Sequence, residues 1–253
     1  MHRFYIAPPA WNPAALQLED GEAHHALGVL RLKAGDRVVV FDGRGQEATA
    51  EITAVGSKKS VSLRILHAAK TPPLPCRIVL AQAVPKGKNM DLIIQKATEL
   101  GAAEIAPLLS DRTVVRIEDE RGEAESKREK WQSVAIEAAK QCGQNWLPTV
   151  GLPKSPKEFL AERAKEFDLL WIASLQPDAK HPRAWLSEYA AGARPKSALI
   201  LVGPEGDFTP AEIAMAKAAG CRPISLGPIV LRTETAAIYC LSVLSYELLS
   251  HPL

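Results

Sequence analysis

The segment from Leu226 to Leu249, LGPIVLRTETAAIYCLSVLSYELL, joins a turn, an apolar loop and a helix in one continuous stretch. Gly227 and Pro228 end a short apolar strand, PISLG, and three aliphatic residues follow. Arg232 and Glu234 stand between threonines, and a helix that is apolar on most faces is predicted for Ala236 to Leu249. Thr233 or Thr235 is expected to cap that helix. Since surface loops are usually polar, this one is predicted to fold over a ligand; a loop packed in the core is the alternative.

A second strand end has a similar character. LVGPEGDFTPAE, Leu201 to Glu212, carries an apolar strand into Gly203-Pro204-Glu205-Gly206. Thr209, Pro210 and Glu212 predict a capping box for the next helix, whereas the glycines let the backbone approach a ligand closely. An ordinary tight turn is the alternative. Parallel sheets bind ligands beyond the carboxyl ends of their strands, so the two segments together predict a site for a flat apolar ring with an anionic part near Arg232.

The rest of the chain divides near AAKTPPLPC, Ala68 to Cys76, where three closely spaced prolines predict a stiff connector. Short strands separated by turns precede it, which predicts a small β-barrel over residues 1–70. After it, strands alternate with helices, which predicts an α/β domain with a mostly parallel sheet over residues 76–253. The expected strands are Arg3–Ile6, Asp36–Phe41, Ala48–Val55, Ser60–Leu66, 77–84, 104–109, 169–173, 198–203 and 223–227, and the expected helices are Glu22–Leu30, 88–103, Glu123–Cys142 and Ala236–Leu249.

Composition excludes several classes of protein. The 253 residues carry a net charge of +2, so charge alone does not predict a nucleic-acid partner. The four cysteines are scattered without a CxxC pair, so we expect no metal site and buried, reduced thiols. No segment is apolar enough for a membrane span or a signal peptide, and a cytoplasmic protein is expected. GxGxxG, GxxxxGK[ST] and GxSxG are absent, which disfavours nicotinamide enzymes, P-loop enzymes and serine hydrolases.

These motifs resemble those of the ribosomal RNA small-subunit methyltransferase E family, in the SPOUT superfamily of methyltransferases. The resemblance covers both predicted domains. It rests on LVGPEGDFTPAE and LGPIVLRTETA, in this order near the end of the chain, and on three further stretches: HHALGVLRLKAGDRVVVFDGRG, KGKNMDLIIQKATELGAAEIAPLLSDRT and EAAKQCGQ.

The resemblance implies a PUA-like β-barrel followed by an α/β SPOUT domain with a C-terminal trefoil knot. It implies S-adenosylmethionine as cofactor, a homodimer, and methylation of N3 of a uridine in 16S ribosomal RNA of the small subunit, without a metal or a membrane. The implied cofactor-binding residues are Leu201, Val202, Gly203, Pro204, Glu205, Gly206, Leu226, Gly227, Ile229, Leu231, Arg232, Thr235 and Ala236.

Uridine N3 carries a proton, so catalysis has to orient the reactants and favour the deprotonated base. Arg232 is the first candidate to stabilise charge on the uracil, and Arg112 is a second. Glu234 or Glu205 is a candidate proton acceptor, although Glu234 also suits a helix cap. Two departures from the family pattern are Asp207, where a glycine is common, and Gln144, where an arginine is usual.

A small basic excess predicts where RNA binds. Residues 1–70 hold nine Lys or Arg against seven Asp or Glu, and the rest of the chain balances at 22 of each. The expected phosphate contacts are Arg3, Arg31, Lys33, Arg37, Lys86, Lys88 and Arg112. Two other functions stay open: a SPOUT methyltransferase acting on a different ribosomal or transfer RNA nucleotide, and a non-catalytic RNA-binding module.

Overall fold

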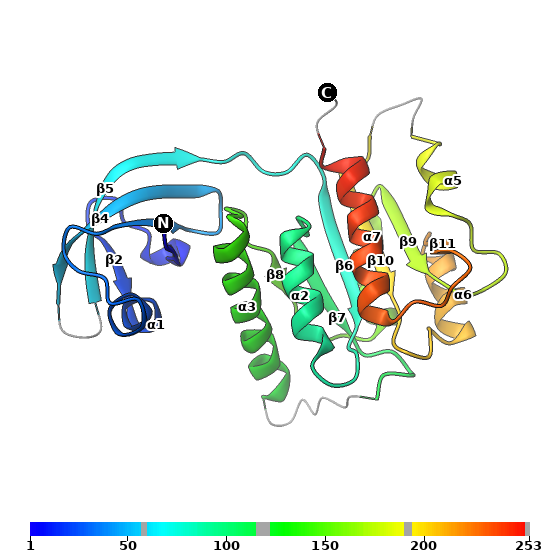
Figure 1. The fold of residues 1–253 in the computed structure, drawn as a ribbon. Helices are drawn as coiled ribbons and strands as arrows, with labels where there is room; N and C mark the ends of the chain where they lie inside the picture. Colours follow the sequence, from blue (N-terminus) through cyan, green and yellow to red (C-terminus); the bar gives the residue numbers. More distant parts are fainter. Residues whose placement is uncertain (57–59, 115–121, 190–193, 251–253) are drawn as a thin grey trace. The chain divides into compact units, whose positions relative to one another are not determined.

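The computed structural model describes residues 1–56, 60–114, 122–189 and 194–250. The chain forms two compact units (Figure 1). The first comprises Met1–Pro73 and Ile136–Leu147, and the second comprises Leu74–Ala135 and Pro148–Leu253. The sequence-based boundaries placed 136–147 in the second domain, whereas the structure packs this segment with the first unit.

The first unit is built on a five-stranded sheet in the order β1-β3-β4-β5-β2. β1 pairs with β3 in parallel, and the other pairs are antiparallel. Register shifts between Thr49 and Ala50 and between Ile52 and Ala54 interrupt the β4–β5 ladder, as bulges that bend a sheet do. The elements are β1 (Arg3–Tyr5), a 3-10 helix (Pro8–Ala10), β2 (Leu16–Glu19), α1 (Asp20–His24) with a π-helical continuation (His25–Val29), β3 (Arg37–Phe41), β4 (Gln46–Val55) and β5 (Ser60–Lys70).

One strand of this sheet was missed in the sequence. β2 is only four residues long, LQLE, so its alternation of buried and exposed positions is too brief to stand out. The predicted helix Glu22–Leu30 is present as α1 and its π-helical continuation. The buried face of this helical segment packs against the strands in a single hydrophobic core, in which Phe4, Ala23 and Ala26 are fully buried.

Segment 136–147 is tied to the first unit by polar contacts. Lys140, whose side chain is only 8% exposed, pairs with Glu22 at 2.9 Å. Burial raises the pKa of Glu22, while the hydrogen bond to Lys140 opposes that shift. The indole of Trp146 donates to the carbonyl of Thr71 at 3.0 Å. These partners lie far from the segment in sequence, which is why local patterns could not reveal them.

The second unit contains a six-stranded sheet in the order β11-β9-β10-β6-β7-β8, with every pair parallel. This confirms the α/β prediction. The elements are β6 (Arg77–Ala83), α2 (Asn89–Glu99), β7 (Glu104–Leu108), α3 (Glu123–Cys142, which ends in the first unit), β8 (Thr149–Val150), α4 (Pro156–Arg163) with a 3-10 turn (Ala164–Glu166), β9 (Leu169–Ala173), α5 (Pro182–Leu186), β10 (Ser197–Val202), α6 (Pro210–Ala218), β11 (Arg222–Ile224) and α7 (Thr233–Leu248).

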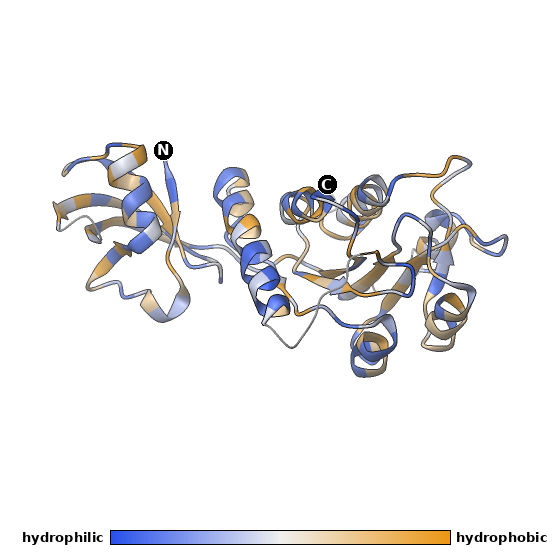
Figure 2. Ribbon diagram, turned by 90° about the horizontal axis from the view of Figure 1, so that it is seen from below, coloured by the Kyte–Doolittle hydropathy of each residue, from blue (hydrophilic) through white to orange (hydrophobic). Residues whose placement is uncertain are grey.

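Helices cover both faces of this sheet. α2 and α7 pack against each other on one face, and α4 and α6 pack against each other on the opposite face (Figure 2). β6 and β10 lie in the middle and are buried almost throughout, which explains their continuous apolar sequences. Within the described ranges, no helix is long and apolar enough to cross a membrane.

The predicted helix cap is confirmed for α6 and wrong for α7. Thr209 caps α6 in a complete capping box with Glu212. The same signature at Ser155 and Glu158 begins α4, a helix that the sequence analysis missed, along with α5. Neither Thr233 nor Thr235 caps α7; its N-cap is Arg232, without a side-chain cap, because Thr233 turns its hydroxyl elsewhere.

The helical spacing of Trp131, Val134, Ala138 and Cys142 predicts one apolar face for α3, and all four cysteines were expected to be buried; both expectations need correction. Trp131 and Ala138 are buried as expected, but Val134 is only partly buried and Cys142 is exposed. The other three cysteines are buried, and burial raises the pKa of the Cys221 thiol to about 12. Ala135 and Ala139 are buried together with Trp131 and Ala138, so the buried stripe includes two alanines that the predicted face left out.

Candidate active site

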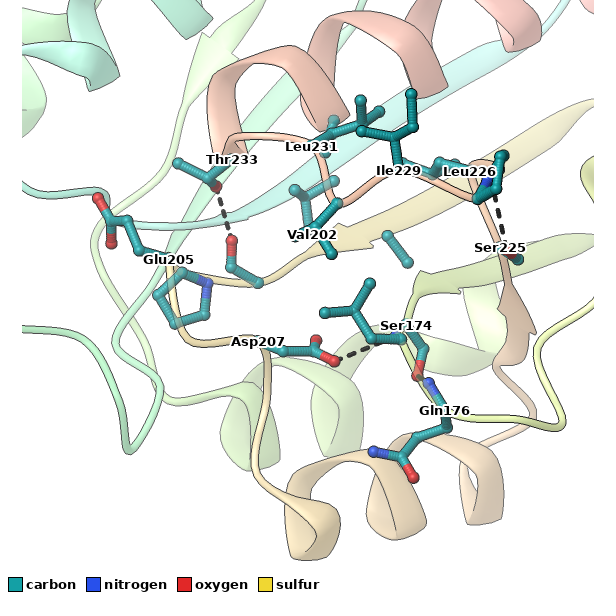
Figure 3. A pocket seen from close by; sticks show the side chains of 18 residues that line it. Ser174, Gln176, Val202, Glu205, Asp207, Ser225, Leu226, Ile229, Leu231 and Thr233 are labelled. Carbon is teal, nitrogen blue, oxygen red and sulfur yellow. Dashed lines mark hydrogen bonds between the residues drawn. The ribbon is translucent and has the colours of Figure 1, made fainter.

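A cavity of about 330 Å³ lies at the carboxyl ends of β9, β10 and β11 in the second unit. This volume lies within the range of small-molecule sites. Three strand-end loops and the first turn of α7 form its walls (Figure 3). The lining residues are Ala173, Ser174, Leu175, Gln176, Val202, Gly203, Pro204, Glu205, Asp207, Ser225, Leu226, Gly227, Pro228, Ile229, Val230, Leu231, Thr233 and Ala236.

One side of the cavity is apolar. Figure 3 shows Leu226, Ile229 and Leu231 along the loop that precedes α7, with Val202 beside them at the end of β10. Within this loop Ile229 is 73% exposed and Val230 is 71% exposed, an unusual state for neighbouring aliphatic side chains. Such a wall suits a flat apolar group.

Gly227 leaves open space at this wall. Its φ of +116° is in the region that favours glycine. A Cβ at this position would meet no atom within 4 Å. The backbone conformation therefore requires glycine here, and the missing side chain keeps the lining open.

The opposite loop is a tight turn from Gly203 to Asp207. The amide of Asp207 donates to the carbonyl of Pro204 at 3.0 Å. A Cβ on Gly203 would lie 3.1 Å from the amide nitrogen of the buried Phe208, so this glycine is needed for close packing. The turn is therefore held by the protein's own packing before any ligand binds.

A buried hydrogen-bond chain connects the cavity loops to the sheet. Thr233 donates its hydroxyl to the carbonyl oxygen of Gly203 at 2.6 Å. Gln82, at the end of β6, donates from Nε2 to the Thr233 hydroxyl at 3.0 Å and to the carbonyl of Ala83 at 2.9 Å. Among the described residues the Oε1 of Gln82 has no partner. The chain positions β10 against the start of α7.

The charged lining residues are both acidic. Asp207 lies on the floor, where its Oδ2 accepts from the amide of Leu175 at 3.2 Å and its Oδ1 from the amide of Phe208 at 2.7 Å. Glu205 points away from the cavity in Figure 3 and accepts from the amide of Lys86 at 2.9 Å. No lysine or arginine of the described ranges is among the lining residues.

Of the candidate catalytic residues, Glu205 lines the cavity, whereas Arg232, Glu234 and Arg112 lie outside the lining set. Arg232 is exposed, and its side chain makes no hydrogen bond or ion pair to any described residue. Glu234, in the first turn of α7, accepts from Asn89 Nδ2 at 3.2 Å. Arg112 donates from Nη1 to the carbonyl of Gly206. We expected Arg232 beside an anionic ligand group, but the structure leaves it outside the lining set.

Most of the expected cofactor residues lie together. Nine of them line the cavity, whereas Leu201 is buried in β10 and Gly206, Arg232 and Thr235 lie outside the lining. The sequence analysis missed the whole Ala173–Gln176 wall and also Asp207 and Thr233. A signal for that wall existed, since the apolar strand LLWIA ends there and parallel strands share an edge.

The basic residues expected to contact RNA differ in availability. Arg31, Lys33 and Arg37 of the first unit and Lys86, Lys88 and Arg112 of the second are exposed. Arg3 is not: its side chain is 14% exposed and contacts Glu47 at 2.5 Å and Asn145 at 2.7 Å. Gln144 accepts from the amide of Trp146 at 3.2 Å.

Two family models match the chain, one before and one after residue 70. An RNA methyltransferase PUA domain matches residues 18–66, and an RNA methyltransferase domain matches residues 72–245. The second match covers more than half of the chain.

Curated relatives and solved structures agree with these matches. The ribosomal RNA small subunit methyltransferase E of Bacillus subtilis is 36% identical over 230 residues, covering 89% of this chain and 88% of the relative. That of Synechocystis is 32% identical, covering 95% and 76%. The Neisseria gonorrhoeae enzyme of the same name, solved with S-adenosyl methionine, has a TM-score of 0.81 at 30% identity, covering 97% of both chains. A Legionella pneumophila protein described as a methyltransferase and solved with SAM has a TM-score of 0.85 at 35% identity, covering 96% of both.

Proposed function

The chain belongs to the ribosomal RNA small subunit methyltransferase E family, and from this we propose that it methylates N3 of a uridine in 16S ribosomal RNA, using S-adenosylmethionine. Membership makes it an RNA methyltransferase with an α/β methyltransferase domain and a PUA-like domain. The observation that carries the proposal for this chain is the cavity at the carboxyl ends of β9, β10 and β11, formed by the loops that family resemblance assigns to the cofactor.

The cavity residues fit S-adenosylmethionine. The apolar wall of Val202, Leu226, Ile229 and Leu231 suits the adenine ring, and the open space at Gly227 leaves room beside it. Strand-end loops also offer backbone amides and carbonyls for hydrogen bonds, including those of residues 225–231. When bound, the cofactor supplies an activated methyl group on a positively charged sulfur.

The residues of this chain have to orient uridine and manage its proton. Arg232 is exposed, next to the lining residues Leu231 and Thr233, and has no partner among the described residues. It is therefore available to stabilise negative charge on the uracil carbonyls. Glu234 and Glu205 are the candidate proton acceptors. Each already accepts a hydrogen bond, from Asn89 and from the amide of Lys86 respectively, which fixes its carboxylate.

The exposed lysines and arginines supply contacts for ribosomal RNA. Lys86 and Lys88 lie in the β6–α2 connection, and the hydrogen bond from the Lys86 amide to Glu205 joins that connection to the cavity turn. Arg112 joins the same turn through Gly206. Phosphate contacts near the reaction centre are the role that we propose for these three side chains.

Methyl transfer to defined RNA tests the proposal. The protein is incubated with methyl-labelled S-adenosylmethionine and with small ribosomal subunits from a strain that lacks the gene, and the RNA is digested to nucleosides. Label in 3-methyluridine from 16S RNA is the expected result. Label in another nucleoside, or in transfer RNA offered in parallel, would establish the alternative substrate. RNA binding without any transfer would establish a non-catalytic binding module.

We further propose that the protein acts in the cytoplasm as a homodimer with a trefoil knot in its α/β domain, as family resemblance implies. α7 supports the dimer, because Tyr246 on its outer side is 76% exposed and Tyr239 is 37% exposed. These tyrosines line a hollow of about 710 Å³ together with residues of α5, including Pro182 and Leu186. A monomer mass in light scattering at micromolar concentration would contradict the dimer.

A further inference from the structure

Asp207 brings a side chain to a position where the backbone favours none. Its φ is +60°, in the left-handed region that glycine adopts without cost and other residues rarely occupy. Asp and Asn tolerate this conformation better than other side chains do. The backbone of Asp207 is therefore strained, and such strain is often found where a side chain has a function.

The Asp207 carboxylate is fixed in the cavity floor. Two backbone amides hold it: that of Phe208 at 2.7 Å and that of Leu175 at 3.2 Å. Figure 3 shows it extending from the β10 loop toward the β9 loop, across the floor. Both oxygens accept hydrogen bonds from backbone amides, which holds the carboxylate in place, and no described residue forms an ion pair with it.

This charge is not balanced within the cavity. Glu205 is the other charged lining residue, and its carboxylate points away. Among the residues that the structure describes, the lining contains no lysine or arginine, and the remaining side chains are apolar or neutral. A fixed anion in a partly dry, otherwise uncharged wall favours a cationic ligand over a neutral one of the same shape.

We propose that Asp207 is a specificity-determining residue that favours the positively charged cofactor over its neutral product. The inference rests on the proposed function. S-adenosylmethionine carries a sulfonium, whereas S-adenosylhomocysteine, left after methyl transfer, carries a neutral thioether and is otherwise nearly identical. The difference between the two is one positive charge, which is the property that a fixed carboxylate detects. Product release is favoured by the same effect.

Titration calorimetry with both ligands tests this inference on the binding step alone. Asp207→Asn keeps the side-chain volume and tolerates the left-handed backbone, but it removes the charge and, because an amide has one acceptor oxygen, one of the two amide hydrogen bonds. Asp207→Gly removes the side chain and both bonds. In both variants the preference for S-adenosylmethionine should fall by roughly three- to tenfold, the effect of one nearby charge in a partly solvated site. The decrease should be smaller at high salt.

The matched control is Asp178→Asn. Asp178 lies after the β9 loop, pairs with Lys217 and does not line the cavity, so this variant changes the net charge equally and should leave the preference unchanged. If Asp207→Asn weakened the affinity for both ligands by the same factor, Asp207 would have only a structural role and the inference would be overturned. A wild-type protein that binds both ligands equally would also overturn it, although the proposed function would survive. A wild-type protein that binds neither ligand would remove the proposed function as well.

Discussion

The hydroxyl of Thr233 donates to the carbonyl oxygen of Gly203 at 2.6 Å, which joins the first residue of α7 to the first residue after β10. Both residues are buried and both line the cavity. Gln82, from the neighbouring strand β6, completes the contact from the other side at 3.0 Å. The Thr233 side chain thus holds the start of α7 at a fixed distance from the loop after β10, and both of these segments line the cavity.

Replacing Thr233 with valine should destabilise the protein by about 1–3 kcal/mol, because a buried carbonyl loses its donor while the volume is kept. Urea unfolding measures this change. Thr235→Val, two residues further along the same helix and exposed, is the control and should have little effect. Equal stability of the two variants would mean that the buried bond contributes nothing.

Ala236→Leu should block the cavity without straining the backbone. Ala236 lines the cavity from the first turn of α7, a helical position where leucine is well tolerated. We expect S-adenosylmethionine to bind roughly tenfold more weakly or worse, since overpacking costs about 1–3 kcal/mol. Ala214→Leu on the exposed side of α6 is the control. Unchanged calorimetric affinity in Ala236→Leu would place the cofactor elsewhere.

Arg232→Ala should slow methyl transfer with the fold and cofactor affinity retained. Arg232 is exposed, has no partner in the described ranges and does not line the cavity, so neither stability nor cofactor binding depends on it. The barrier should rise by about 3 kcal/mol if Arg232 stabilises charge on the uracil. Single-turnover rates measure this, with Lys157→Ala on α4 as a control for loss of one exposed cation. A full rate in Arg232→Ala would assign the charge stabilisation to another residue.

Reversing two charges in the first unit should weaken RNA binding. Arg31→Glu with Lys33→Glu removes two exposed cations, and the slope of log affinity against log salt should fall by about one per lost phosphate contact. Arg64→Glu with Lys70→Glu changes the net charge of the same unit equally and is the control. If the two double variants bind RNA alike at every salt concentration, the predicted site around Arg31 is wrong.

Asp168 should make stability depend on pH in a defined direction. Its carboxylate accepts from the amides of Lys196 at 2.8 Å and Ser197 at 3.1 Å, and these bonds, led by that from Lys196, lower its pKa from the usual 3.8. A lowered folded-state pKa stabilises the protein above 3.8, and the contribution is lost as pH falls through the folded value.

Asp168→Asn should accordingly be less stable than wild type near neutral pH, and the gap should close in acid. Urea midpoints measured down a pH series check this. A gap that widens in acid would show that the carboxylate does not stabilise the fold through its charge.

Local chemistry determined much of this protein in advance. Alternating strands and helices predicted a parallel sheet, because parallel neighbours need a crossover between them. The Thr209–Glu212 pair predicted the start of α6, because a capping box joins residues only three positions apart. The glycine at 227 and the apolar residues after it, also neighbours in sequence, marked one cavity wall.

Only the tertiary structure decided which strand ends meet. β9 lies between β10 and β11 in the sheet although the three strands are separated in sequence, and this order brings the Ala173–Gln176 wall to the cavity. The sequence marked Ala173 as the end of an apolar strand but did not show which strand ends it would join. Thr233 looked like a helix cap and instead bonds to Gly203, and Arg3 looked like a phosphate contact and instead pairs with Glu47. A side chain can bond to any group that folding brings close to it, whereas the spacing of residues in the sequence reveals only partners a few positions away.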